Sequence, residues 1–165
     1  MQNRKQIYAA ESPRQTKKLG GLLAKEILKS GPGKSPRVLA LTGDLGAGKT
    51  NFIQGFAKGL EIKETISSPT FVIAKIYSLK KSAEFKNFYH IDCYRLKSGD
   101  DLALLGAKEI FSDPQNIVAV EWPLIAADSL PKNTIKIGFE IIDAKCRHIS
   151  MDCSDAKLIM PLLVK

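Results

Sequence analysis

Residues 43–50 read Gly-Asp-Leu-Gly-Ala-Gly-Lys-Thr and match the phosphate-loop pattern G-x-x-x-x-G-K-[ST] at every fixed position. The motif constrains the fold because it functions as a short loop between a buried strand and the start of a helix. Both flanks meet that requirement: residues 37–42 form an apolar run typical of a buried strand, and residues 51–60 space their apolar side chains as a helix does. The sequence therefore predicts a strand–loop–helix unit. The alternative is a glycine-rich turn that binds nothing.

The residue types of this loop suit a polyphosphate. Glycines leave room for main-chain amides to curve around phosphate oxygens, and the helix that follows points the positive end of its dipole at the anion. Lys49 is expected to bind the β- and γ-phosphates, and the Thr50 hydroxyl is expected to ligate Mg²⁺. We expect the nucleotide-binding residues of this segment to be Gly43, Asp44, Leu45, Gly46, Ala47, Gly48, Lys49, Thr50 and Asn51.

Length and composition predict one ordinary globular domain spanning residues 1–165. The 165 residues are 44% hydrophobic and 25% charged, which suits a single core. No apolar run approaches the length of a membrane span, and no apolar segment follows the first residues, so we expect a cytoplasmic protein with no membrane contact. The three cysteines are odd in number and lack C-x-x-C spacing, which favours free thiols.

The net charge of +8 is distributed unevenly. Residues 1–37 contain nine Lys or Arg side chains against Glu11 and Glu26, whereas the rest of the chain is nearly balanced. Such a basic segment could contact RNA or an acidic protein. Because no aromatic residues are interleaved with these charges, a solvated helix face is the favoured interpretation.

The remaining pattern predicts an α/β chain with a P-loop NTPase-like three-layer fold. Its mainly parallel central sheet is extended by antiparallel strands, with helices on both faces. Besides the unit around the motif, we expect a helix from Pro13 to Gly31, strands at 71–79 and 88–92 paired as a hairpin, a helix over 98–111, a buried strand at 116–122, a short helix over 123–130, and strands at 134–141 and 147–152 that close the sheet antiparallel.

Acidic residues end two of these strands. Asp92 follows an apolar run, and from there a carboxylate can reach the Mg²⁺ shell. Glu121 and Trp122 end the 116–122 strand, and ligands of open α/β sheets bind beyond the carboxyl ends of strands. Glu121 is therefore expected to orient the attacking water or to hold a metal-bound water, while Trp122 is either hydrophobic cover or a plate beside the nucleotide. His90 shares a strand face with Asp92, and we expect a partly buried imidazole with its hydrogen bonds satisfied.

The Ser-Ser-Pro-Thr stretch at 67–70 lies between the loop-bearing unit and the next strand. Nucleotide switches hold a hydroxyl ready for Mg²⁺ or the γ-phosphate at this place in the chain. The alternative is an ordinary polar loop, because Ser, Thr and Pro commonly cluster in loops. The spacing alone leaves both interpretations open for Thr70.

Taken in order, the motifs G-D-L-G-A-G-K-T at 43–50, S-S-P-T-F at 67–71, H-I-D-C-Y-R-L at 90–96 and V-E-W-P at 120–123 resemble the bacterial TsaE family, also called YjeE. The resemblance covers nearly the whole chain. It has two departures: Cys93 replaces an aliphatic residue, and Leu124 stands where the family more often has an acid, so no metal role is expected at position 124.

The resemblance implies an ATPase that uses ATP and Mg²⁺. Its role would be to form N6-threonylcarbamoyladenosine at the tRNA adenine next to the anticodon, with the TsaB and TsaD proteins and after TsaC has made the threonylcarbamoyl-adenylate. We expect a monomer when alone, with slow turnover stimulated by a partner and only indirect or weak contact with tRNA. By resemblance the catalytic residues are Lys49, Thr70, Asp92 and Glu121, the metal-binding residues are Thr50, Asp92 and Glu121, and Trp122 lies near the nucleotide; Tyr94 and Arg95 match without an assigned role.

The sequence leaves two alternatives open. A small-molecule P-loop kinase would use the same loop but usually needs an arginine-rich lid, and after Asp92 the sequence offers only Arg95 and Lys97. A non-enzymatic RNA-binding module would use the basic first third of the chain. Guanine-nucleotide switching is disfavoured because no Asn-Lys-x-Asp motif is present.

Overall fold

The computed structural model describes residues 5–164. A seven-stranded sheet in the order β1-β7-β6-β2-β5-β4-β3 forms its centre. The strands are β1 (Gln6–Ala10), β2 (Arg37–Thr42), β3 (Ala74–Ser78), β4 (Asn87–Asp92), β5 (Asn116–Glu121), β6 (Ile135–Ile141) and β7 (Arg147–Asp152). The helices are α1 (Pro13–Ser30), α2 (Lys49–Gly59), α3 (Gly99–Ala103) and α4 (Ala107–Ile110), with 3-10 turns η1 (Ala127–Ser129), η2 (Ala156–Leu158) and η3 (Met160–Val164).

The sheet has a parallel centre and antiparallel edges. β4, β5, β2 and β6 run parallel to one another, β3 pairs antiparallel with β4, and β7 pairs antiparallel with both β6 and β1. This confirms the predicted fold class and the predicted hairpin. The expectation that both late strands close the sheet antiparallel was wrong for β6, because the chain after β5 crosses back and enters beside β2 in the same direction. Edge strand β1 was not predicted.

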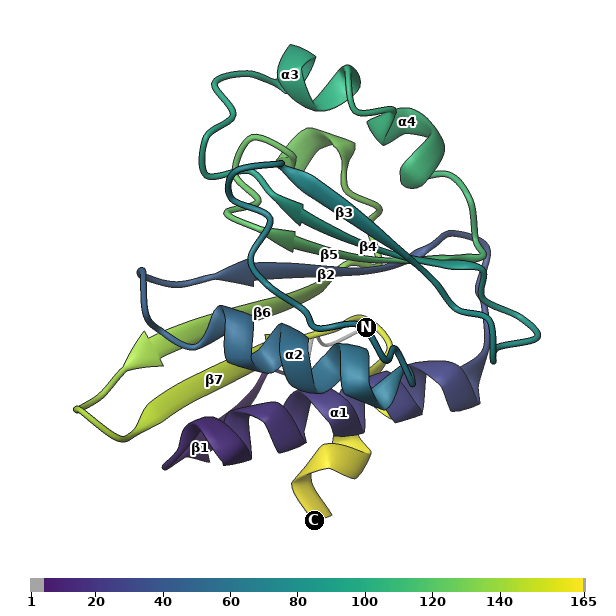
Figure 1. Cartoon of the computed structure of the whole chain (residues 1–165). Coiled ribbons are helices and arrows are strands. Elements are labelled where there is room, and N and C mark those ends of the chain that lie inside the picture. Colours follow the sequence, from purple (N-terminus) through teal and green to yellow (C-terminus); the bar gives the residue numbers. More distant parts are fainter. Residues whose placement is uncertain (1–4, 165) are drawn as a thin grey trace.

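Helices cover both faces of the sheet, which gives the three predicted layers (Figure 1). α1 and α2 lie on one face over a core that includes Phe52, Phe56 and Phe88. α3 and α4 cover the parallel strands on the other face, over a smaller core that includes Ile91 and Leu102. None of the helices within residues 5–164 is long and apolar enough to cross a membrane.

Glycines allow α1 and α2 to pack closely, and this contact positions the motif. A Cβ on Gly20 would overlap the Phe52 carbonyl, and a Cβ on Gly55 would overlap the Lys17 carbonyl. The two helices therefore approach until backbone meets backbone. As a result, the N-terminal ends of both helices lie near the 43–48 loop. Ser12, the N-cap of α1, lines the same hollow as Gly46 and Gly48, and Gly48 is the N-cap of α2.

Three local predictions needed correction. The helix expected over 98–111 is split into α3 and α4 at Gly106, whose φ of 73° is left-handed. The helix expected over 123–130 is only the 3-10 turn η1, because Pro131 disfavours α conformation in the residue before it and few residues separate it from Pro123. The strand expected from residue 71 begins at Ala74, because residues 71–73 form a turn that ends at Ile73 with φ 67°.

Candidate nucleotide-binding site

The loop between β2 and α2 has its amides free to bind an anion. Gly43, Gly46 and Gly48 have φ values of 143°, 78° and 105°, which only glycine adopts readily. The amides of Leu45, Gly46 and Gly48 donate to no acceptor within residues 5–164, and the first turn of α2 contains no acidic residue. Unpaired amides at the N-terminus of a helix attract phosphate groups. The loop therefore fits the polyphosphate that its sequence predicts.

Lys49 lies folded against this loop. Its Nζ donates hydrogen bonds to the carbonyls of Gly43 at 2.6 Å and Asp44 at 3.0 Å, and it lies 4.3 Å from the centre of the Trp122 ring. Burial lowers the pKa of the ammonium, while the negative charges of Glu121, Asp92 and Asp44 act in the opposite direction. The side chain is thus a desolvated cation, held by neutral groups, at the mouth of the loop.

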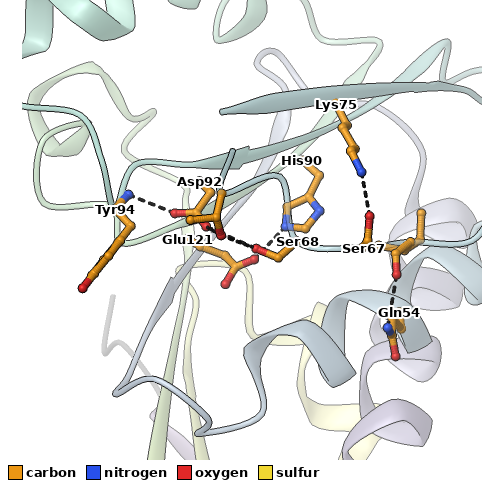
Figure 2. Close-up of polar contacts among 10 residues, drawn as sticks. Gln54, Ser67, Ser68, Lys75, His90, Asp92, Tyr94 and Glu121 are labelled. Carbon is orange, nitrogen blue, oxygen red and sulfur yellow. Dashed lines mark hydrogen bonds and ion pairs between the residues drawn. The ribbon is translucent and has the colours of Figure 1, made fainter. Parts of the chain in front are cut away.

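Asp92 connects the end of β4 to the Ser-Ser-Pro-Thr loop (Figure 2). Its Oδ2 accepts hydrogen bonds from Thr70 Oγ1 at 2.7 Å and Ser68 Oγ at 3.3 Å, and its Oδ1 accepts one from the Tyr94 amide at 2.9 Å. The carboxylate is 3% exposed, so these donors replace water around it. A movement of Asp92 would therefore be transmitted to the loop at 67–70.

Glu121 ends β5 beside Asp92, because the two residues are register partners in the parallel pair β4–β5. Its Oε1 lies 2.7 Å from His90 Nε2. His90 is fully buried, not partly buried as expected. The expectation that its hydrogen bonds are satisfied was wrong for Nδ1, which has no partner among the residues that the structure describes. Both acids thus point to the face of the sheet on which α2 begins.

Trp122 closes the site from the side of β5. Its φ of 54° is left-handed, and its amide donates to the Leu41 carbonyl at the end of β2. This backbone turn brings the indole over Lys49, and the Tyr94 ring lies 5.0 Å from it. Trp122 is therefore a wall of the cleft and not part of the core alone.

These side chains line a cleft with a volume of about 330 Å³. It brings together most of the predicted residues: Leu45, Gly46, Gly48, Lys49, Thr50, Asn51, Thr70, Asp92, Glu121 and Trp122. Gly43, Asp44 and Ala47 do not line it; the first two supply the carbonyls that hold Lys49, and Ala47 is buried. Ser68 and Tyr94 line the cleft without having been predicted to do so.

The side chains near the loop offer only part of the coordination shell that a hard cation needs. Within residues 5–164 no three His, Cys, Asp or Glu side chains are grouped to hold a metal ion. Mg²⁺ usually takes one or two carboxylates and completes its shell with water and substrate phosphates. Thr50, Asp92 and Glu121 around the cleft match that pattern, so the residues fit a cation that arrives with a nucleotide.

The family model described as "Threonylcarbamoyl adenosine biosynthesis protein TsaE" matches residues 10–149. The chain belongs to the TsaE family. It is 40% identical over 107 residues to the TsaE protein of Borreliella burgdorferi, covering 64% of this chain and 74% of that one. It is 34% identical over 146 residues to the TsaE protein of Rickettsia typhi, covering 88% and 93%.

The fold also matches a solved structure. The crystal structure of YdiB from Bacillus subtilis superposes with a TM-score of 0.76 at 28% identity, and the match covers 99% of this chain and 97% of that one. The predicted resemblance to the TsaE family is therefore confirmed by sequence, and the predicted architecture by structure.

A second hollow of about 290 Å³ adjoins the 43–48 loop and was not predicted from the sequence. It shares Gly46, Gly48 and Asn51 with the first cleft and extends to Ser12, Thr16, Lys145 and Arg147. These residues come from the start of α1 and from the β6–β7 turn. Their proximity depends on the sheet order, so no local sequence signal could have revealed it.

Proposed function

We propose that this TsaE-family chain is a Mg²⁺-dependent ATP hydrolase required for threonylcarbamoyladenosine formation next to the anticodon of tRNA, and that it acts as an ATP-driven switch on a TsaB–TsaD complex. The observation that carries the proposal is the meeting of Lys49, Asp92 and Glu121 in one cleft at the phosphate loop. A cation and two acids at the N-terminus of a helix are the parts that phosphoryl transfer to water requires.

The two hollows would bind different parts of the nucleotide. The free amides of the loop, the dipole of α2 and Lys49 would bind the phosphates in the first cleft. The adjoining hollow, with Thr16 and Arg147, would receive the sugar and base. Thr50 and Asp92 would hold Mg²⁺, with Glu121 on its water shell. When bound, the cation would neutralise charge on the phosphate oxygens.

The chain's own groups then act by position. Lys49 exchanges its two loop carbonyls for phosphate oxygens, which also reduces the cost of its burial. Glu121 has one oxygen bound to His90 and the other without a hydrogen bond within residues 5–164, so it can orient a water molecule. The hydrogen bonds from Thr70 and Ser68 to Asp92 link the state of the cleft to the 67–70 loop.

An exposed apolar rim supports the proposed partner. We define the rim as Leu45, Phe71, Tyr94 and Leu124, whose exposed fractions are 83%, 84%, 60% and 88%. Leu45 and Tyr94 line the cleft, and Phe71 and Leu124 lie within two residues of its lining residues Thr70 and Trp122. Large exposed apolar side chains near a cleft are typical of protein contacts. No arginine lines the cleft within the described part of the chain. A partner seated on the rim would complete the charge stabilisation, so turnover alone is slow and contact with tRNA is indirect.

The first test is ADP release from the purified chain with ATP and Mg²⁺. Lys49→Ala and Asp92→Ala should each reduce the rate by more than about 100-fold. Lys58→Ala, a change to an exposed lysine at the end of the same helix, should leave it unchanged. A wild-type rate no higher than that of Lys49→Ala would refute the hydrolase.

The second test addresses the switch. Adding TsaB and TsaD proteins should raise the ATPase rate of the wild type, and replacing the rim residues Phe71 and Leu124 with Ser should abolish the increase without changing the basal rate. If the rate is the same with and without these proteins, the partner half of the proposal is wrong while the hydrolase stands.

A further inference from the structure

His90 is enclosed in the protein core directly behind Glu121. Its side chain is 0% exposed, it lies on β4 two residues before Asp92, and it does not line the cleft. Its Nε2 is 2.7 Å from Glu121 Oε1, and Figure 2 marks this contact with a dashed line. His90 is therefore too enclosed to contact a nucleotide, and its side-chain hydrogen bond to Glu121 is its direct link to the cleft.

The direction of this hydrogen bond follows from the partners. An ionised carboxylate only accepts hydrogen bonds, so the proton lies on Nε2 of His90. Nδ1 is buried and has no partner within the residues that the structure describes. A buried histidine with one ring nitrogen lacking a hydrogen-bond partner stabilises the folded state less than an apolar side chain at the same position would. Packing alone therefore does not account for an imidazole here.

The bond fixes one of the two oxygens of Glu121 and leaves the other for the cleft. Oε1 is bound to His90, while Oε2 makes no hydrogen bond within residues 5–164, although Glu121 lines the cleft. A second attraction competes for this carboxylate: the negative charge of Glu121 is the strongest of three that act on the buried Lys49 ammonium. Without the bond to His90, the carboxylate would be free to rotate toward Lys49.

We propose that His90 is a positioning residue that holds Glu121 by its Oε1, so that Oε2 faces the place of the attacking water instead of pairing with Lys49. The inference rests on the proposed ATP hydrolysis and deepens it. It predicts that the hydrogen bond from position 90, and not the shape of the ring, controls turnover.

The decisive variants are His90→Leu, which removes the donor, and His90→Gln, whose amide nitrogen can replace Nε2. His90→Leu should lower kcat about 10- to 100-fold, as loss of a group that orients a catalytic carboxylate does. The dissociation constant of ATP, followed by the fluorescence of the single tryptophan, should change less than about threefold, because His90 does not line the cleft and its side chain forms a hydrogen bond only to Glu121 within residues 5–164. His90→Gln should recover most of the lost kcat.

A double-variant cycle separates positioning from stability. In a Glu121→Ala background, His90→Leu should change single-turnover hydrolysis by less than about twofold, because residues that act as one unit are not additive. The matched control is His148→Leu, a half-buried histidine on β7 at the far side of the sheet, which should leave kcat unchanged. A full further loss in the Glu121→Ala background, or an equal loss for His90→Gln and His90→Leu, would overturn the inference.

One readout does not depend on hydrolysis. The sequence has two histidines, so ¹⁵N spectra of the wild type and His148→Gln assign the His90 ring. We expect a protonated Nε2 and an unprotonated Nδ1, with the Nε2 signal shifting in Glu121→Ala. A proton on Nδ1 alone would refute the proposed bond even in an active enzyme, whereas absent hydrolysis with the expected spectrum would refute only the proposed function.

Discussion

Lys49→Met provides the sharpest separation of function from stability in this chain. The side chain is 5% exposed, and its ammonium is held by the Gly43 and Asp44 carbonyls at 2.6 and 3.0 Å. Burial lowers its pKa in spite of three nearby acids. The folded state therefore disfavours the charged form relative to water, and an apolar side chain of similar length removes that cost.

The expected effect of Lys49→Met differs between the protein without nucleotide and the protein with nucleotide. Without nucleotide, the loss of two hydrogen bonds and the relief of a desolvated charge nearly cancel, which leaves a net change of about 1 kcal/mol or less in the free energy of unfolding. For a chain of this size that is a shift of about 2–4 °C in Tm. With nucleotide, the variant lacks a charge-assisted contact worth about 1.5–3 kcal/mol, so its affinity should fall about 10- to 150-fold.

Thermal unfolding with and without nucleotide measures both effects. At a nucleotide concentration about 100 times the wild-type Kd, the wild type should gain about 2.7 kcal/mol, or about 5–11 °C. A variant that binds about 100-fold more weakly is then only half saturated and gains about 0.4 kcal/mol, or about 1–2 °C. A full nucleotide-induced shift in Lys49→Met would refute the assignment of Lys49 to phosphate. A fall of more than about 10 °C without nucleotide would refute the reasoning on burial.

Two further predictions concern the core. Burial raises the pKa of the Cys93 thiol to about 11 and also raises that of Cys153, so at pH 8 only about one Cys93 in a thousand is a thiolate. A disulfide reagent should therefore react rapidly with one thiol of the native protein, the half-buried Cys146, and with three thiols after denaturation. Rapid reaction of all three thiols in the native protein would contradict this. Gly55→Ala should lower the free energy of unfolding by more than about 3 kcal/mol in urea titrations, because its Cβ would overlap the Lys17 carbonyl, whereas Gly99→Ala, with nothing near the added atom, should change it by less than about 1 kcal/mol.

The parts of the site that the sequence predicts are those that depend on neighbouring residues. The strand, loop and helix around residues 43–50 follow from contiguous patterns, and α1 follows from Ser12, Pro13 and the glycine that ends it. Asp92 and Glu121 could be placed at one edge because parallel strands deliver their carboxyl ends together. Each of these features is determined by residues within one helix or strand, or by the pairing of adjacent parallel strands.

What the sequence could not predict depends on register and on distant contacts. The bond from His90 to Glu121 requires β4 and β5 to be neighbours with Asp92 opposite Glu121, and one residue of slip would turn these side chains to the other face. The second hollow requires α1 to begin next to the β6–β7 turn. Edge strand β1 has only five residues, too few for a periodic pattern to be distinguished from a loop.

The charged side chains of the proposed nucleotide site are not paired with one another. Lys49, Asp92 and Glu121 are 5%, 3% and 3% exposed, yet within residues 5–164 Lys49 forms no ion pair with either acid. Loop carbonyls hold Lys49, hydroxyls and an amide hold Asp92, and the His90 ring is hydrogen-bonded to Glu121. A direct Lys49–Glu121 pair would satisfy both charges and leave neither free to act on a ligand. The neutral partners of Lys49 and Asp92 are exchanged at lower cost than an opposite charge would be, so this arrangement would leave both groups available to the proposed phosphate and its metal ion.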